Sequence, residues 1–227
     1  MYIFDIDGTL LDTLKVISYH LNKTLKAYGL VEIPIKKVRE FVGNGPKILL
    51  NRAFDYQNFD GDESLKEEIY NVYNKSYDDN PLYLTEPFSG IKEALDILKE
   101  RNEIVVAFSN KPDQTCKKIL NGIFGENYFD YILGFRNDYK RKPSAEGLMI
   151  IADHFGVNFS DILYFGDSEV DIKCGKNANV FTVACSWGLR DREILEKEKP
   201  DLIIDSPEEI TSIRRIWDFR SILCKLL

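Results

Sequence analysis

The sequence predicts an α/β fold in which a doubly wound parallel sheet carries an inserted α-helical domain. From residue 100 onward, short apolar runs alternate with helical patterns, which is typical of a parallel sheet whose strands are joined by helices. One further apolar run lies at the N-terminus. Between that run and the others, residues 15–85 have helical spacing and no strand-like run, so we expect an insertion there.

The first strand is predicted in "YIFDI", residues 2–6, where apolar side chains lead up to an acid. Apolar residues then recur at the spacing of one helical face, which predicts a helix; they are Leu14, Ile17, Leu21 and Leu25. The prolines of "DDNPLYLTEPFSG", residues 78–90, favour a linker back to the sheet. We therefore expect a Rossmann-like core domain of residues 1–14 and 86–227 and a helical cap domain of residues 15–85.

The remaining strands are predicted in runs rich in Ile, Val, Leu, Phe or Tyr, the composition of strands buried on both faces. They are "EIVVAF" (103–108), "YIL" (131–133), "ILYFGD" (162–167), "VFTVAC" (180–185) and "DLIID" (201–205). Helices are expected between them, because proline and serine favour a first helical turn. They are "PDQTCKKILNGIF" from Pro112, "PSAEGLMIIADHF" from Pro143 and "SPEEITSIRRIW" from Ser206.

Composition and charge argue against several classes of partner. The 227 residues are 44% hydrophobic and carry a formal net charge of -7, which opposes non-specific attraction to nucleic acid or to an anionic membrane surface. No run approaches the roughly 18 apolar residues of a membrane span. The cysteines lack the spacing of a metal site and predict reduced thiols; they are Cys116, Cys174, Cys185 and Cys224. We expect a soluble cytoplasmic protein, either a monomer or a homodimer.

Polar residues follow several predicted strands at the point where each strand ends, and Lys142 precedes a predicted helix in the next unit. They are Asp5, Asp7, Ser109, Asn110, Lys142, Asp167 and Asp171. In a doubly wound sheet, ligands bind at the carboxyl ends of the strands. Because parallel strands end at one edge of the sheet, we expect these side chains to lie close together and to form a site.

The acids of this group predict a cation site. Two unit charges about 4 Å apart interact by roughly 4 kcal/mol at an effective dielectric constant of 20, so Asp5, Asp7 and Asp167 would repel one another strongly. Mg²⁺ takes oxygen ligands and commonly binds between carboxylates and a substrate phosphate, so we predict an Mg²⁺ site that admits a phosphate ester. A carboxylate such as Asp5 can then attack phosphorus while its neighbour handles the leaving-group proton. Ser109 and Lys142 can stabilise the phosphoryl oxygens.

Four motifs, in order along essentially the whole chain, resemble those of the haloacid dehalogenase-like phosphohydrolases. They are "DIDGTLLDT" (5–13), "SN" (109–110), Lys142 in "RKP" and "GDSEVD" (166–171). In the dehalogenases of this family, the position equivalent to Asp7 is not acidic, because no leaving alcohol needs a proton. The acid at this position therefore favours phosphate over halide.

The resemblance also implies a role for each matching residue. Asp5 is expected to be the nucleophile that forms an aspartyl-phosphate, and Asp7 the general acid and base. Ser109 and Lys142 are expected to hold the phosphoryl group. The implied Mg²⁺ ligands are the carboxylates of Asp5 and Asp167 and the backbone carbonyl of Asp7, with Asp171 orienting the fourth motif.

A closer resemblance is to the phosphoglycolate phosphatases. Residues 30–54 look like their cap segment, with "GNG" at 43–45, and "SNKP" at 109–112 and "SWG" at 186–188 also match. The resemblance implies hydrolysis of a small phosphate monoester, with phosphoglycolate the leading substrate.

Recognition of the leaving group is expected from the cap, because the core residues contact only the phosphoryl group. The carboxylate of a glycolate leaving group needs cations or backbone N–H donors. Arg52 is the first choice, with Arg39 and Lys47 nearby. The full set of expected substrate contacts is Gly8, Thr9, Gly43, Asn44, Gly45, Arg52 and Asn110.

Several of these residues also have a purely structural interpretation. The two acids of the first motif could form only an Asx turn, Ser109 and Asn110 could be the N-cap of the helix from Pro112, and residues 43–45 could be no more than a turn between helices. His20 and His154 lie in helical patterns, and we interpret them as packing or surface residues.

Three other functions are compatible with the sequence. A sugar phosphomutase of the same fold would return the phosphoryl group to a bound sugar phosphate. A phosphatase of this fold could also hydrolyse inorganic pyrophosphate. A phospho-accepting receiver module has a similar arrangement of Asp, Ser and Lys with Mg²⁺. A receiver needs no inserted cap and carries its acceptor after a later strand, so the sequence favours an enzyme.

Overall fold

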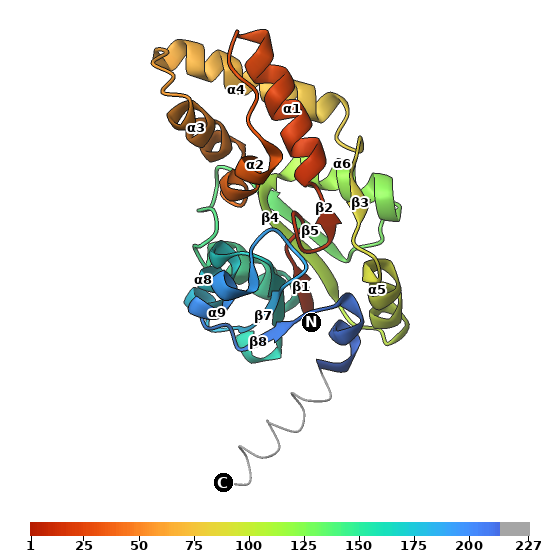
Figure 1. Ribbon diagram of the computed structural model, residues 1–227. Coiled ribbons are helices and arrows are strands. Elements are labelled where there is room, and N and C mark those ends of the chain that lie inside the picture. The colour runs from red at the N-terminus through yellow and green to blue at the C-terminus, as the bar shows by residue number, and fades with distance from the viewer. Residues whose placement is uncertain (214–227) are drawn as a thin grey trace.

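The computed structural model describes residues 1–213 of the chain, and within them a parallel sheet forms the centre of the molecule (Figure 1). Its strand order is β5-β4-β1-β6-β7-β8, and every pairing is parallel. The strands are β1 (Tyr2–Phe4), β4 (Val105–Pro112), β5 (Tyr131–Phe135), β6 (Leu163–Gly166), β7 (Phe181–Cys185) and β8 (Leu202–Ile204). The strand order turns around at β1, so the predicted doubly wound α/β fold is confirmed.

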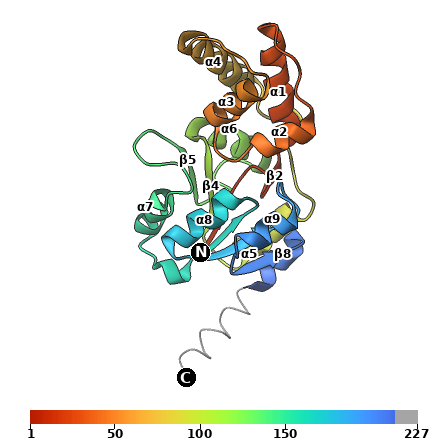
Figure 2. The same ribbon diagram turned by 60° about the vertical axis from the view of Figure 1, so that its left-hand side comes forward.

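Helices cover both faces of this sheet (Figure 2). Successive side chains of a strand point to opposite faces, and accordingly Tyr2 and Phe4 belong to one apolar cluster while Ile3 belongs to another. The first cluster includes residues of α5 (Ile91–Glu100) and α6 (Asp113–Phe124), and the second includes residues of α7 (Glu146–Phe155) and α8 (Glu169–Ala178). The sheet is therefore buried on both sides, as its apolar runs predict. The shorter segments are η1 (Phe159–Asp161), α9 (Arg192–Lys197) and η2 (Pro207–Ser212).

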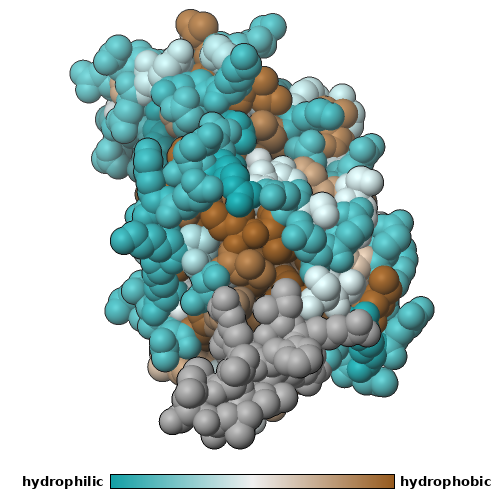
Figure 3. Space-filling view, turned by 60° about the horizontal axis from the view of Figure 1, so that its bottom comes forward, coloured by the Kyte–Doolittle hydropathy of each residue, from teal (hydrophilic) through white to brown (hydrophobic). Residues whose placement is uncertain are grey.

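Four helices between β2 and β3 lie over one end of the sheet (Figure 1). They are α1 (Leu14–Ala27), α2 (Ile35–Phe41), α3 (Pro46–Tyr56) and α4 (Glu63–Asp79), and we call them the helical insertion. The α1 side chains of Ile17, Leu21 and Leu25 are buried, as their spacing predicts. Figure 3 shows mostly hydrophilic residues over the helical insertion, and apolar residues gathered on the sheet-containing part of the molecule.

A short antiparallel pair, β2 (Leu11–Asp12) with β3 (Glu86–Pro87), was not predicted. Two-residue strands are too short to produce a readable periodicity. The pair joins the two segments that run between the sheet and the helical insertion, and the second of these is the linker predicted at 78–90.

Strand β4 continues beyond its predicted end at residue 108. Its register against β5 shifts between Phe108 and Pro112 and resumes where Pro112 pairs with Phe135. Ser109 and Asn110 thus lie in the irregular end of the strand. Helix α6 follows with Pro112 at its N-cap position and has no side-chain cap, so the interpretation of Ser109 and Asn110 as a helix N-cap is wrong.

Two predicted helices also differ in detail. The one expected from Pro143 begins only at Glu146, because the Ser144 amide donates to the Arg141 carbonyl in a preceding turn. The one expected from Ser206 is the 3₁₀ segment η2, which starts with a capping box between Ser206 and Glu209. Its predicted continuation beyond residue 213 lies outside the described residues.

Three cysteines and His20 are buried in the described residues, whereas His154 is exposed. The buried thiols of Cys116, Cys174 and Cys185 are free, as predicted, and Cys224 lies outside the described residues. His20 is buried, with Nδ1 2.9 Å from the Ser76 hydroxyl, and His154 stacks on Tyr131 with ring centroids 4.5 Å apart. Of the helices described in residues 1–213, none is long and apolar enough to cross a membrane.

Candidate active site

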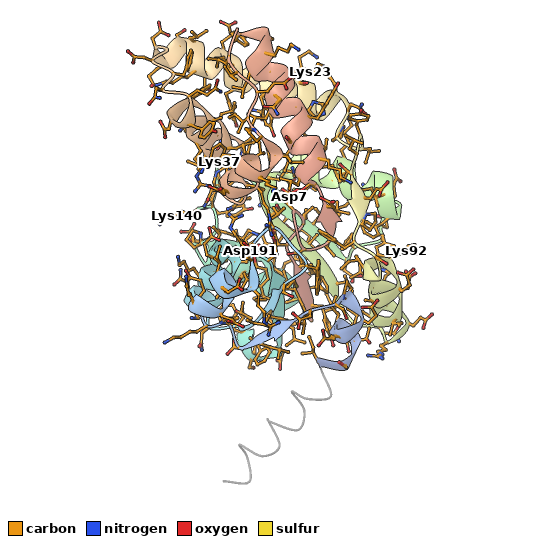
Figure 4. All side chains as sticks on the ribbon, in the orientation of Figure 1. Asp7, Lys23, Lys37, Lys92, Lys140 and Asp191 are labelled. Carbon is orange, nitrogen blue, oxygen red and sulfur yellow. The ribbon has the colours of Figure 1, made fainter. Side chains whose placement is uncertain are left out.

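The predicted site residues meet at the carboxyl edge of the sheet, beside the helical insertion. Strand β1 lies between β4 and β6, so Asp5 after β1, Ser109 in β4 and Asp167 after β6 come together. Figure 4 shows Asp7 at the junction between the sheet and the helical insertion. The topology thus places these residues at the position where ligands bind in doubly wound sheets.

Lys142 forms the centre of a buried network of ion pairs. Its Nζ lies 2.7 Å from Asp5 Oδ1 and 2.6 Å from Asp171 Oδ1, and the Tyr164 hydroxyl donates to Asp171 Oδ1 at 2.7 Å. The backbone N–H of Lys142 donates to Asn110 Oδ1 at 2.8 Å. The third motif is therefore connected directly to the first, second and fourth motifs.

Gly8 and Thr9 support Asp167 instead of lining the cavity, where we expected them to contact substrate. The Thr9 hydroxyl donates to Asp167 Oδ1 at 3.1 Å, and the Leu189 amide donates to Oδ2 at 2.7 Å. Gly8 has φ +90°, and a Cβ atom there would lie 2.2 Å from Asp167 Oδ2. Only glycine fits this position, because the Asp167 carboxylate packs against the backbone of the first motif.

Three buried acids could hold a metal ion together. One carboxylate oxygen from each of Asp5, Asp167 and Asp171 lies within 4.8 Å of the others. Asp171 takes the place in this cluster that the electrostatic prediction gave to the Asp7 carboxylate. Its oxygens are already engaged by Lys142, Tyr164 and Ser168, an arrangement that orients the carboxylate. The described donors are all oxygens, which suits a hard divalent cation.

Burial and mutual repulsion disturb the ionisation of these acids. Burial, followed by the charge of Asp171, raises the pKa of Asp5 well above its ordinary value, although Lys142 opposes this. The same two causes raise the pKa of Asp167 to about 7. Burial also acts to raise the pKa of Asp171, but Lys142 outweighs it and holds that pKa below its ordinary value. Without a further cation, burial and repulsion therefore make full ionisation of both Asp5 and Asp167 less favourable than for exposed acids.

A cavity of about 50 Å³ opens beside the acids, between the sheet edge and the helical insertion. A cavity needs roughly 10–15 Å³ of probe-occupied volume to hold a single water, so this one has room for a small ligand. Its lining includes Asp5, Asp7, Ser109, Asn110 and Lys111 from the sheet side and Gly43, Gly45, Tyr73 and Tyr77 from the helical insertion. A small ligand would contact both parts of the molecule.

The loop at residues 43–45 does more than connect α2 to α3. The Asn110 side-chain amide donates to the Gly43 carbonyl at 3.1 Å, which ties the loop to the second motif. Gly45 has φ +86°, and a Cβ atom there would lie 3.0 Å from the backbone oxygen of Asn110 in β4. The close approach of this loop to β4 therefore requires a glycine at 45.

Arg52 does not lie where we expected it. Its guanidinium donates to the Phe41 carbonyl at 2.8 Å and to Asn44 Oδ1 at 2.9 Å. It thereby braces the 43–45 loop, and neither Arg52 nor Asn44 lines the cavity. Arg39 likewise forms an ion pair with Asp191 and donates a hydrogen bond to the Gly188 carbonyl. Lys47 is exposed and forms an ion pair with Glu67. The three cations proposed for the leaving group are all held by other partners, because carbonyls and acids outside the cavity lie within their reach.

Sequence reasoning missed the lysine that does line the cavity. Lys111 is buried, and its Nζ lies 3.1 Å from the Tyr77 hydroxyl and 3.3 Å from Asp7 Oδ2. Burial alone would lower its pKa, but Asp7 and the tyrosines raise it well above the ordinary value, so the side chain stays charged. The available signal was its position in "SNKP", two residues after Ser109. Tyr77 follows Tyr73 by one helical turn of α4 and faces the same cavity.

Comparison with known proteins identifies the family. The family model for haloacid dehalogenase-like hydrolases matches residues 2–185. The chain is 31% identical over 211 residues to the phosphoglycolate phosphatase of Aquifex aeolicus (93% of this chain, 94% of the relative). It is 27% identical to the phosphoglycolate phosphatase of Haemophilus influenzae (92% of this chain, 96% of the relative).

A solved structure shows the same arrangement. The crystal structure of a predicted phosphoglycolate phosphatase from Haemophilus somnus superimposes with a TM-score of 0.89 at 26% identity, covering 94% of this chain and 97% of that one. The residues that the family model matches include the four motifs that resemble this family. The chain therefore belongs to the haloacid dehalogenase-like hydrolases, in the group that resembles the phosphoglycolate phosphatases.

Proposed function

We propose that this protein is an Mg²⁺-dependent phosphatase that hydrolyses a small phosphate monoester, with phosphoglycolate as its leading substrate, through an aspartyl-phosphate on Asp5. The observation that carries the proposal is the meeting of Asp5, Lys142 and the acidic cluster beside a cavity between the sheet edge and the helical insertion. The names of the relatives support phosphoglycolate as the substrate.

The reaction proceeds in two displacements. A carboxylate oxygen of Asp5 attacks phosphorus, the bond from phosphorus to the leaving oxygen breaks, and Asp7 gives its proton to the leaving alcohol. Water then attacks the phosphorus of the aspartyl-phosphate while Asp7 accepts a proton from it. The bond from phosphorus to the Asp5 oxygen breaks, which releases inorganic phosphate and restores the carboxylate. Asp7 Oδ1 is buried and has no partner among the described residues, which suits a group whose partner is the substrate or water.

The residues present fit the metal that this chemistry needs. Asp5 and Asp167 would hold Mg²⁺ by their carboxylates and Asp7 by its backbone carbonyl, while Asp171 is kept in place by Lys142 and Tyr164. When bound, the ion supplies positive charge that offsets the acids and the phosphate dianion. Lys142 and Ser109 stabilise charge on the phosphoryl oxygens.

The two parts of the molecule are expected to have different roles in the reaction. We propose that residues 1–14 and 86–227 form the core domain that carries phosphoryl transfer, and that residues 15–85 form a cap over the leaving group. The helical insertion contributes one side of the cavity lining, which supports this division.

The other candidate functions differ in what they do with the phosphoryl group. A phosphomutase would return it to a sugar phosphate, and a pyrophosphatase would release two phosphates. A receiver module would take up one equivalent and stop, and the hydrolase family match disfavours it.

Phosphate release from a substrate panel tests the proposal. With Mg²⁺ present, we expect the highest kcat/KM for phosphoglycolate among phosphoglycolate, pyrophosphate, glucose 1-phosphate and an aryl phosphate. Much faster turnover of pyrophosphate or a sugar phosphate would overturn the substrate assignment. Release of no more than one equivalent from every phosphodonor would overturn the phosphatase itself.

Ser109→Ala is expected to lower kcat by about 10²–10³-fold, the usual effect of removing one donor to a developing negative charge. Ser109 is buried, lines the cavity, and its Oγ accepts the Lys111 amide at 3.3 Å. The measurement is steady-state kinetics, with exposed Ser64→Ala as the control. A change confined to KM would mean that Ser109 only binds substrate.

The metal-free protein is expected to lose stability as pH rises toward neutrality. The folded-state pKa of Asp167 is raised to about 7, whereas an unfolded aspartate titrates near ~3.9. The folded state therefore retains a proton that the unfolded chain releases. The stabilisation from this proton is fully present below about pH 4 and is lost as pH rises through about 7.

Mg²⁺ is expected to reverse this trend, because it binds the ionised carboxylates. Added Mg²⁺ should raise Tm more at about pH 8 than at about pH 5.5, and Asp167→Asn should remove most of the difference. Thermal unfolding of chelated protein with and without Mg²⁺ measures both effects. An equal Mg²⁺-induced shift at the two pH values would contradict the assignment.

A further inference from the structure

Lys111 is a buried cation that phosphoryl transfer does not use. Lys142 is already paired with Asp5 and Asp171. Lys111 extends instead from β4 toward the helical insertion, with its Nζ 4.3 Å from the centre of the Tyr77 ring. Its presence there needs a separate explanation.

The charges around the cavity call for a second cation. Within the described residues that line the cavity, the acids are Asp5, Asp7 and Asp78, and Lys111 is the sole lysine or arginine. A substrate with a carboxylate on its leaving group would bring a further negative charge to the insertion side of this cavity. Burying such a charge without a counter-ion is costly.

The geometry of Lys111 leaves room for that role. An ammonium group has three N–H donors, and among the described residues its side-chain partners are the Tyr77 hydroxyl at 3.1 Å and Asp7 Oδ2 at 3.3 Å. One N–H can therefore be directed to a ligand oxygen without breaking either contact. The Tyr77 ring and hydroxyl hold the ammonium at a fixed place between the two parts of the molecule.

We propose that Lys111, held in place by Tyr77, is the residue that selects substrates whose leaving alcohol carries a carboxylate. This inference rests on the proposed phosphatase function and identifies its specificity-determining cation, which is not Arg52. Because Lys111 also contacts Asp7, the carboxylate it binds lies beside the group that protonates the leaving oxygen. The substrate class is thus a phosphate ester of a short hydroxy acid.

The test compares two substrates that differ only in the anionic group. Phosphoglycolate carries a carboxylate where 2-hydroxyethyl phosphate carries a neutral alcohol. A hydrogen bond to a charged group contributes roughly 1.5–3 kcal/mol, so we expect the unaltered enzyme to prefer phosphoglycolate by about 10- to 100-fold in kcat/KM. Lys111→Met should bring this ratio close to one, while Lys111→Arg should keep much of the preference because it keeps the charge.

The matched control is Lys47→Met, which removes an exposed lysine of α3 that does not line the cavity and should leave the ratio unchanged. Lys111→Gln serves as a second neutral variant if Lys111→Met unfolds, as judged by circular dichroism. An equal loss on both substrates in the Lys111 variants, or a ratio near one in the unaltered enzyme, would overturn the inference. Neither result would touch the phosphatase assignment, which fails only if the unaltered enzyme turns over no monoester.

Discussion

Replacing Asp5 with asparagine is expected to abolish phosphate release, with kcat falling by more than roughly 10⁴-fold. An amide oxygen is a poor nucleophile, although its shape is nearly that of a carboxylate. Lys142 keeps its 2.6 Å contact with Asp171 in the variant, so the buried lysine retains a counter-ion. The fold is therefore expected to remain intact while the covalent step is lost.

Three measurements decide this prediction. Steady-state phosphate release gives kcat, thermal unfolding shows whether Tm is preserved, and rapid quenching with labelled substrate detects the phosphoenzyme, which should be absent. Asp60→Asn, an exposed acid of the helical insertion, is the matched control and should behave as the unaltered enzyme. Near-normal turnover by Asp5→Asn would exclude the covalent mechanism.

Asp7→Asn provides an informative comparison, because it removes the proton donor and leaves the nucleophile in place. We expect slow turnover in which phosphoenzyme accumulates, since hydrolysis of the intermediate also needs Asp7. The pair of variants therefore separates formation of the intermediate from its breakdown.

Removal of divalent metal is expected to cause the second large effect, loss of activity to below detection. The oxygens of Asp5, Asp167 and Asp171 lie within 4.8 Å of one another, and two unit charges at that separation repel by about 3.5 kcal/mol at an effective dielectric constant of 20. Lys142 alone does not offset three acids and an incoming phosphate dianion. Burial and this repulsion also raise the pKa of Asp5, and a protonated carboxyl group is a poor nucleophile.

The assay uses enzyme dialysed against chelator, with residual metal measured by elemental analysis. Adding Mg²⁺ back should restore the rate, and chelator already saturated with Mg²⁺ is the control for other effects of the chelator. Full activity in protein shown to be free of metal would overturn the proposed cofactor.

Much of the fold could be predicted because its signals are local. The apolar runs of β1, β6 and β7 contain enough residues to mark strands, and the run at 103–108 located β4 but not its end. The missed β2 and β3 have two residues each, and the shape of η2 depends on a capping box and not on apolar periodicity. Such elements are hard to predict from the spacing of hydrophobic residues, because a few specific hydrogen bonds determine their form.

The sequence by itself determined the catalytic end of the site. Residues that follow parallel strands must meet at one edge of the sheet, so Asp5, Ser109 and Asp167 converge once the strands pair in this order. Lys142 and Asp171 follow from the same motifs. This part of the site depends on backbone topology, which the strand and motif pattern encodes.

Only the tertiary structure decided which cation lines the cavity. Arg52 and Lys111 are both long, flexible side chains, and their directions depend on partners that are distant in sequence. The Phe41 carbonyl captures Arg52 at 2.8 Å, whereas Tyr77 of α4 and Asp7 hold Lys111 in the cavity. The directions of these side chains depend on how the helical insertion packs against the sheet, and the order of residues along the chain does not reveal them.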